Sequence, residues 1–269
     1  MNALSFNLHE VAVLAPGLTS FAELQEVFRD NLVINNAEPL ILAVPELLPP
    51  NERRRSSQSV RLVLSCISQL AKTSQFQLNE IRSVFATDDG VGEVSQQMLE
   101  VLSTTRQISP LVFPNSVHSA TAGYFSIAYR NQKPSTVVSR GLESFAAGLL
   151  CAVIETLTVN EPVLFVCSDP VMTHPMDELL PITQPTALAW LLSAGDSTAP
   201  VLASFALTIE SDEQLCTPLP LWIPKEWRSN SASYGYAALE LLASQSQDFY
   251  RLGYGAQTLK LELIKREPL

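Results

Sequence analysis

The sequence has 269 residues, of which 46% are hydrophobic and 16% charged, and these proportions are typical of a folded globular protein with a sizeable core. Its formal net charge of −10 argues against nucleic acid or an anionic membrane as a partner, because the overall field would repel either one. Four cysteines without a CxxC pair predict reduced thiols and a cytoplasmic protein, and we expect neither a signal peptide nor a membrane span.

In the first part of the chain, strand-like and helical patterns alternate. Residues 10–15 are a short apolar run that predicts a buried strand. Ser20 and Glu23 have the spacing of a capping box, which predicts the start of a helix that ends near Asp30. Prolines punctuate residues 31–50 and favour an irregular excursion, and the basic run after it, Arg53 to Arg55, is interpreted as a solvated loop. The pattern then predicts a helix at 57–72, a strand at 81–87 and a helix at 92–102.

Candidate metal ligands are few. Asp88 and Asp89 follow the strand at 81–87, but no histidine, cysteine or third carboxylate lies at ligand spacing, which favours a polar turn. His174 and Asp177 lie in an irregular segment with no second histidine nearby. We therefore expect no metal site and no cofactor.

The middle of the chain is its most informative part. Residues 114–130 predict one helix, which includes His118. A β-branched strand at 136–138 then runs through a short turn into a helix of small residues at 143–154. Such turns usually hold the nucleophile in α/β enzymes, but this one offers Arg140, Gly141 and Leu142, and leucine can neither attack a carbonyl nor transfer a proton.

The remaining segments complete an α/β layered fold. Residues 162–168 predict a buried strand, and 185–194 and 200–209 predict two long strands joined by Gly195, Asp196 and Ser197. We interpret these two strands as a hairpin that forms an antiparallel margin on an otherwise parallel sheet. A covering loop at 211–230, a helix at 232–246 and a half-exposed strand at 258–265 follow.

From about Val11 to Ile209 the chain resembles the N-terminal half of the β-ketoacyl synthases, which have the thiolase-like fold. The resemblance rests on six segments in order, AVLAPG, FAELQEVF, ERRRSSQSVRLVLSCISQLA, VFATDDGVGE, SATAGYFSIAYR and KPSTVVSRGLESFAAGLL. NSVHSATAGYFSIA and KPSTVVSRGLESFAAGLL look like the short ketosynthase-like proteins of aryl polyene gene clusters, which are described as chain-length-factor-like.

This resemblance implies a mixed β-sheet flanked by helices. It implies a single domain over 1–269, with a ketosynthase-like core at 1–210 and an extension at 211–269. The nucleophilic cysteine of the family falls at Leu142, and residues after Ile209 contain no histidine, although the second half of the family carries two catalytic ones. The resemblance therefore implies a non-catalytic subunit without a cofactor, which pairs as a heterodimer with an active, full-length β-ketoacyl-ACP synthase in aryl polyene chain extension. An acyl carrier protein is a further expected partner.

The resemblance also assigns residues to two surfaces. The strand 135–139 is expected to pair antiparallel across the subunit interface, with anchors at Thr136, Val137, Val138, Leu142 and Phe145. Side chains on the helix at 114–130 are expected to line the partner's acyl tunnel, namely Phe113, Val117, His118, Thr121 and Tyr124. In this arrangement a bulky side chain across the tunnel limits chain growth, because overpacking costs about 1–3 kcal/mol.

Two alternatives remain open. The protein could be a free-standing acyl-thioester hydrolase or transferase, with His118 as the base and Ser116 or Ser139 as the nucleophile. Against this alternative, no acidic residue in the sequence is placed to orient His118. We therefore interpret His118 as a residue that lines a pocket or lies in the core. The other alternative is a purely structural ketosynthase partner with no effect on chain length.

Overall fold

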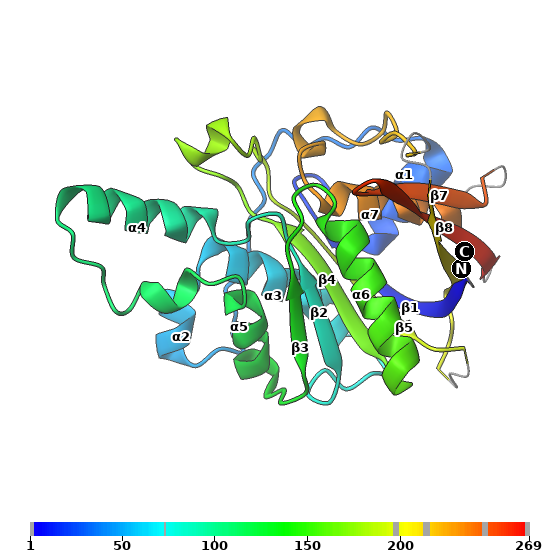
Figure 1. Cartoon of the computed structure of the whole chain (residues 1–269), viewed down its shortest axis with the longest axis horizontal. Helices are drawn as coiled ribbons and strands as arrows, with labels where there is room; N and C mark the ends of the chain where they lie inside the picture. Colours follow the sequence, from blue (N-terminus) through cyan, green and yellow to red (C-terminus); the bar gives the residue numbers. More distant parts are fainter. Residues whose placement is uncertain (1–2, 73, 196–198, 212–215, 244–246, 267–269) are drawn as a thin grey trace.

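The computed structural model describes residues 3–72, 74–195, 199–211, 216–243 and 247–266. Its eight strands form one mixed sheet in the order β3-β2-β4-β5-β1-β6-β8-β7 (Figure 1). The strands are β1 (Leu4–Leu14), β2 (Arg82–Ala86), β3 (Ser135–Val138), β4 (Val163–Asp169), β5 (Thr186–Ser193), β6 (Ala203–Glu210), β7 (Phe249–Tyr254) and β8 (Gln257–Arg266). The predicted α/β class with a mixed sheet is confirmed.

The predicted hairpin between the strands at 185–194 and 200–209 is wrong. β1 lies between β5 and β6 and pairs antiparallel with both, through residues 7–14 on one edge and 4–8 on the other. Of the predicted connection, Gly195 is described, while Asp196 and Ser197 lie outside the described residues. β2 is parallel to β3 and β4, and the remaining pairs are antiparallel. The antiparallel part is thus most of the sheet rather than its margin.

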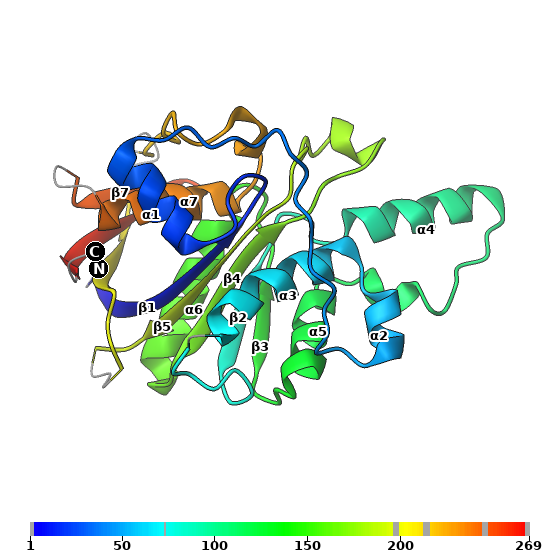
Figure 2. The same cartoon turned by 180° about the vertical axis from the view of Figure 1, so that it is seen from behind.

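Helices cover both faces of the sheet, and each face has its own core. α3 (Gln58–Ala71) and α5 (Ala120–Tyr129) pack on one face, and α1 (Phe21–Asp30), α6 (Ser144–Val159) and α7 (Ala232–Leu239) pack on the other. In Figure 1 α6 lies in front of the sheet, and in Figure 2 α3 does. Successive side chains of a strand point to opposite faces, so Trp190 of β5 joins the α6 core while Ala189 and Leu191 join the α3 core.

The start of α1 is close to its prediction. Ser20 Oγ accepts a hydrogen bond from Glu23 N–H at 3.2 Å, as a capping residue does. The Glu23 carboxylate accepts from the N–H and hydroxyl of Thr19 rather than from Ser20. By contrast, Arg53 to Arg55 do not form a loop: they end a short helix, α2 (Pro50–Arg55), which begins with the proline that helix starts favour.

Several boundaries differ from the predictions. β1 begins six residues earlier than predicted, and α4 (Gly92–Thr104) is slightly longer. The predicted helix at 114–130 is broken: a 3₁₀ turn, η1 (Phe113–Asn115), is followed by α5 from Ala120. The Ser116 hydroxyl donates to the Phe113 carbonyl oxygen at 2.8 Å, a local bond that competes with helix formation.

The C-terminal part of the chain contains a strand that was not predicted. β7 pairs with β8 as a hairpin whose turn contains Gly255 at φ 63°. α7 ends at Leu239, earlier than predicted, and continues as a 3₁₀ turn, η5 (Glu240–Leu242), while residues 244–246 lie outside the described residues. Two further 3₁₀ turns, η2 (Met176–Glu178) and η4 (Lys225–Trp227), lie in the connecting loops.

α6 is the central helix of its layer. The segment Gly141–Val159 has a mean hydropathy of 1.6 and is long and apolar enough to cross a membrane, but 56% of it is buried inside the protein, as expected for a core helix. A Cβ at Gly148 would lie 2.6 Å from the Cβ of Ala86 and 2.7 Å from the ring of Phe165. The small residue is therefore required for α6 to lie directly on β2 and β4.

Candidate functional site

The turn between β3 and α6 presents an aliphatic side chain at the surface. Gly141 has a φ of 58°, a left-handed conformation that glycine adopts at little cost. Ser144 Oγ accepts from Arg140 N–H at 2.8 Å and lies 2.9 Å from the Thr87 carbonyl oxygen, which fixes the turn against the end of β2. Leu142 is 45% exposed. The exposed position of this turn therefore holds a side chain that can serve neither as nucleophile nor as base.

A cavity of about 320 Å³ lies beside Leu142. One wall comes from the start of α6, with Glu143 and Ala146, and the other from the loop at 216–219 and from Leu252 of β7. None of the lining residues is a histidine. His9 is buried between Ser193 and the Pro200 carbonyl, and His118 and His174 are exposed elsewhere. The lining thus contains a thiol, Cys216, and a carboxylate, Glu143, but no histidine, which is the commonest base in acyl transfer.

The carboxylate in this cavity is engaged in structural contacts. Glu143 accepts from Gly255 N–H at 2.9 Å and 3.0 Å, and it pairs with Arg140 at 2.7 Å. The Arg140 guanidinium lies 4.8 Å from the centre of the Tyr254 ring. These contacts fasten the β7–β8 turn to the first turn of α6.

Three carboxyl groups meet where β2 and β4 end. Asp169 is fully buried and accepts from Asp88 N–H at 2.8 Å, Ser231 Oγ at 2.8 Å and Ala232 N–H at 3.2 Å, so it caps the start of α7. Burial raises the pKa of the Asp169 carboxyl. Burial, together with the charges of Asp169 and Asp89, raises the pKa of Asp88 to about 6.

The hydrogen bonds of Asp169 in this cluster hold parts of the fold together, namely the backbone of Asp88 and the start of α7. Among the described residues, no group of three or more histidine, cysteine or acidic side chains is placed to hold a metal ion. Asp88 and Asp89 form the polar turn that the sequence predicts.

The five expected tunnel residues are not gathered in one place. Thr121 and Tyr124 of α5 are buried in this subunit, whereas Phe113, Val117 and His118 are exposed. The break between η1 and α5 separates the two sets: Phe113 belongs to η1, Val117 and His118 lie between the two elements, and Thr121 and Tyr124 belong to α5. Asn115 stabilises the break by donating its side-chain N–H to the Arg55 carbonyl at 2.8 Å.

The expected interface residues also divide. Thr136, Val137 and Val138 are half-buried on β3, which is the edge strand of the sheet, and Leu142 is exposed. Phe145 is completely buried, with ring-centre distances of 5.6 Å to Phe165 and 5.4 Å to Trp190. The expectation that Phe145 is an interface anchor is therefore corrected, because the first turn of α6 directs this side chain into the core.

The alternative Ser–His pair is not assembled. Ser139 Oγ donates to the Asp88 carbonyl oxygen, Ser116 Oγ donates to the Phe113 carbonyl oxygen, and within the described residues no hydrogen bond joins either serine to His118.

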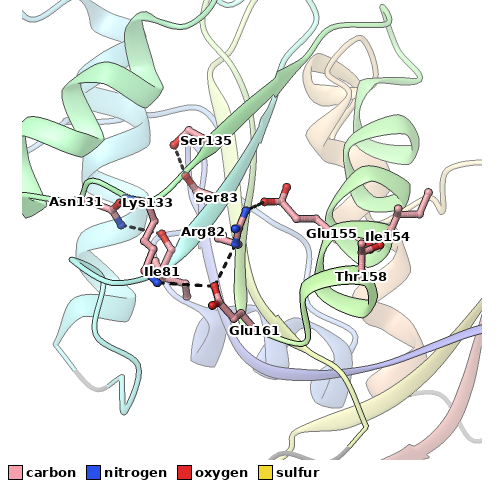
Figure 3. Close-up of polar contacts among 10 residues, drawn as sticks. All are labelled: Ile81, Arg82, Ser83, Asn131, Lys133, Ser135, Ile154, Glu155, Thr158 and Glu161. Atoms are coloured by element: carbon pink, nitrogen blue, oxygen red, sulfur yellow. Dashed lines mark hydrogen bonds and ion pairs between the residues drawn. The ribbon is translucent and has the colours of Figure 1, made fainter.

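A polar cluster that the sequence patterns did not indicate fixes the start of β3 (Figure 3). Arg82 of β2 pairs with Glu155 of α6 and with Glu161, each at 3.1 Å, and Lys133 lies 3.9 Å from Glu161. The hydroxyls of Ser83 and Ser135 are 2.6 Å apart. Asn131 donates to the carbonyl oxygens of Leu78 and Ile81 at 2.6 Å and 2.8 Å. The hydrogen bonds among these contacts join residues 50 to 79 positions apart, which local patterns cannot reveal.

Solved structures with a similar fold include ketosynthase complexes. One chain of the Xenorhabdus doucetiae ketosynthase ApeO in complex with its chain length factor ApeC has a TM-score of 0.72 and 22% identity, covering 96% of this chain and 99% of that one. The ishigamide ketosynthase/chain length factor gives 0.71 and 13%, covering 97% of this chain and 100% of that chain. The AntDE:AntF complex, a type II PKS acyl-carrier protein with its ketosynthase, gives 0.74 and 13%, covering 97% and 99%.

The sequence comparisons place the chain in one family. No curated protein matches the sequence. A family model described as the N-terminal domain of β-ketoacyl synthases matches residues 28–218, which is more than half of the chain. The chain therefore belongs to the β-ketoacyl synthase family.

Proposed function

We propose that this chain is a non-catalytic, chain-length-factor-like subunit that pairs with an active, full-length β-ketoacyl-ACP synthase and shapes its acyl tunnel during polyene, specifically aryl polyene, extension. The observation that carries the proposal is the 45% exposure of Leu142, an aliphatic side chain on the strand-to-helix turn, where the resemblance to the family lays the nucleophile. The adjoining cavity has no histidine in its lining, and its carboxylate, Glu143, is held by Arg140 and Gly255.

The unpaired outer edge of β3 is evidence that a second subunit binds there. The carbonyl oxygen of Pro134 accepts from Ser83 N–H of β2, and that of Val138 accepts from Thr87 N–H, directly after β2. Hydrogen bonds alternate along a parallel ladder, so the N–H and C=O groups of Ser135 and Val137 point away from β2. An open edge with half-buried valines is a template for another strand, and pairing it with a second subunit removes an aggregation hazard.

The side chains around this edge suit two different tasks. Val137, Val138 and Leu142 supply apolar area for the interface, with Thr136 beside them. Of the tunnel set, Phe113, Val117 and His118 are exposed and free to enter a partner's tunnel wall. Thr121 and Tyr124 are buried in this chain, so in the proposal they shape the tunnel only through the helix that carries them.

Several further properties belong to the same proposal. The chain acts as one domain, with a core at 1–210 and an extension at 211–269 whose hairpin is fastened to α6 through Glu143. It works in the cytoplasm as part of a heterodimer, and an acyl carrier protein delivers the growing chain to that complex. Similarity to solved ketosynthase and chain length factor complexes supports the choice of partner.

The test is co-expression with the full-length β-ketoacyl synthase of the same organism, followed by mass determination and a malonyl-dependent extension assay with and without this chain. We expect a stable heterodimer that extends only when both chains are present. Val137→Pro removes an outward N–H and leaves the bonds to β2 intact, so it should abolish the heterodimer without unfolding the chain. An isolated chain that ignores the ketosynthase, or that alone hydrolyses acyl thioesters, would refute the proposal.

A further inference from the structure

The two edge strands of the sheet differ in how their outward backbone groups are bonded. On β7, the outer strand at one side, Arg251 donates its N–H to the Thr217 hydroxyl at 3.0 Å, and its carbonyl oxygen accepts from Thr217 N–H at 2.9 Å. On β3, at the other side, the outward groups of Ser135 and Val137 have no such partner within the described residues. The β3 edge is therefore the one left open to another strand.

The register of β3 is not secured by its length. The strand has four residues and pairs with β2 on one side only. A slip by one residue would turn the outward N–H and C=O of Val137 toward β2, and it would move each side chain to the other face of the sheet. A partner strand that adds to this edge therefore needs other contacts that keep β3 at one register.

The segment that leads into β3 is fixed at successive points (Figure 3). Asn131 is buried and donates to two carbonyl oxygens just before β2, at 2.6 Å and 2.8 Å. It also accepts from Lys133 N–H at 2.7 Å. The next residue, Pro134, accepts from Ser83 N–H at 3.2 Å. The chain is thus held in place from the end of α5 to the first residue of β3.

A pair of hydroxyl groups depends directly on the register. Ser83 and Ser135 lie opposite each other in the β2–β3 ladder, and their Oγ atoms are 2.6 Å apart. Ser83 is fully buried, whereas Ser135 lies on the exposed side of the strand. A slip by one residue would place Pro134 or Thr136 opposite Ser83, so the bond between the two serines forms only in the observed register.

The neighbouring residue, Arg82, joins the same strand pair to α6. Its guanidinium pairs with Glu155 and Glu161 at 3.1 Å each, and Lys133, in the segment before β3, lies 3.9 Å from the same Glu161. The side chains of Arg82 and Glu155 are 24% and 16% exposed, so water and salt screen this contact less than a fully exposed pair. The ion pairs therefore connect the start of β2, the end of α6 and the entry to β3.

We propose that Arg82 and Ser83 are positioning residues for partner binding, which hold β3 at the register in which Ser135 and Val137 turn their backbone groups outward. This inference rests on the proposed function and names the residues that prepare the edge for the second subunit. Both residues act through β3. A chain whose edge is already ordered binds without the cost of ordering it, and the apparent affinity falls with the fraction of chains in the competent register.

The experiment measures the affinity of the purified chain for the full-length β-ketoacyl synthase of the same organism by titration calorimetry. If the change leaves about one chain in ten at the competent register, Arg82→Gln and Ser83→Ala should each lower the affinity about tenfold. In the isolated variants, hydrogen exchange should be faster at the N–H groups of Thr136 and Val138, which face β2. Arg82→Lys keeps a cation beside both carboxylates and should bind within about threefold of the unmodified chain.

The matched control is Arg251→Gln. Arg251 pairs with Glu210 at 2.7 Å, and its side chain is 21% exposed, close to the 24% of Arg82. This ion pair joins β6 and β7, on the other side of the sheet from β3. Its loss should also lower the unfolding temperature, but the affinity for the ketosynthase should stay within about twofold. A merely structural role of Arg82 would make the two variants alike in the binding assay.

The outcomes separate this inference from the proposed function. If the unmodified chain binds and Val137→Pro does not, but Arg82→Gln and Ser83→Ala bind like the unmodified chain, the positioning inference is wrong and the proposed function stands. The inference is also wrong if Arg251→Gln loses as much affinity as Arg82→Gln, or if affinity falls while exchange at β3 is unchanged. If the unmodified chain does not bind the ketosynthase, both fail.

Discussion

Asp88 provides a test of the electrostatics at the end of β2. Its carboxyl is partly buried near Asp169 and Asp89, and its pKa rises from the ordinary value of 3.8 to about 6. Because the folded state holds this proton more tightly than the unfolded state, the protein loses stability as pH rises from about 4 to about 6. A shift of this size corresponds to about 3 kcal/mol for a fully buried group, and solvent screening of the partly exposed carboxyl reduces our expectation to about 1 kcal/mol.

The variant Asp88→Asn removes the titrating group and keeps the backbone N–H that donates to Asp169. Urea unfolding at several pH values between 4 and 7.5 measures the difference in unfolding free energy between the variant and the unmodified protein. We expect this difference to move in favour of the variant by about 1 kcal/mol across the range. A flat difference for Asp88→Asn, or one that moves in favour of the unmodified protein, would refute the reasoning.

Two further predictions concern the residues assigned to the tunnel and the interface. Val117→Trp should shorten the products of the assembled complex, because the added bulk raises the cost of each extension by about 1–3 kcal/mol, whereas Val33→Trp, at an exposed valine in the loop after α1, should leave the product masses unchanged. An intact complex with an unaltered product spectrum would favour a purely structural partner. Phe145→Ala should lower the unfolding free energy by about 3–5 kcal/mol in urea titrations while the chain that remains folded still assembles. If the variant keeps the unfolding free energy of the unmodified chain but no longer assembles with the partner, Phe145 is an interface residue after all.

The periodicity of the sequence predicted most helices and strands, because an amphipathic or buried element leaves its pattern in its own residues. The strand order could not be predicted in this way. β1 separates β5 from β6 by pairing with residues almost 200 positions away, and no local pattern records which strand will enter between two others. β7 was missed for a different reason, because its partner β8 is its neighbour in sequence. Its six residues, FYRLGY, are few and include an arginine and a glycine, so they show no clear apolar alternation.

The candidate site shows the same division between local and distant information. The strand, the turn and Leu142 could be predicted because residue types within about ten positions define them. The orientation of Phe145 could not, because its burial depends on Phe165 and Trp190, which come from other strands. Nor could the bond of Glu143 to Gly255, which joins residues 112 positions apart.

The distribution of bonds around the turn also indicates how the site is used. Three groups capable of chemistry are engaged in structure: Ser144 holds the turn, Glu143 fastens the hairpin, and Asp169 caps α7. Exposed around the same cavity are aliphatic Leu142 and Cys216, and β3 presents its outward backbone beside them. Aliphatic surface and an open strand edge can bind another protein but cannot transfer an acyl group. Leu142 and the strand edge therefore support the proposed role in recognition, in which the partner subunit supplies the reaction.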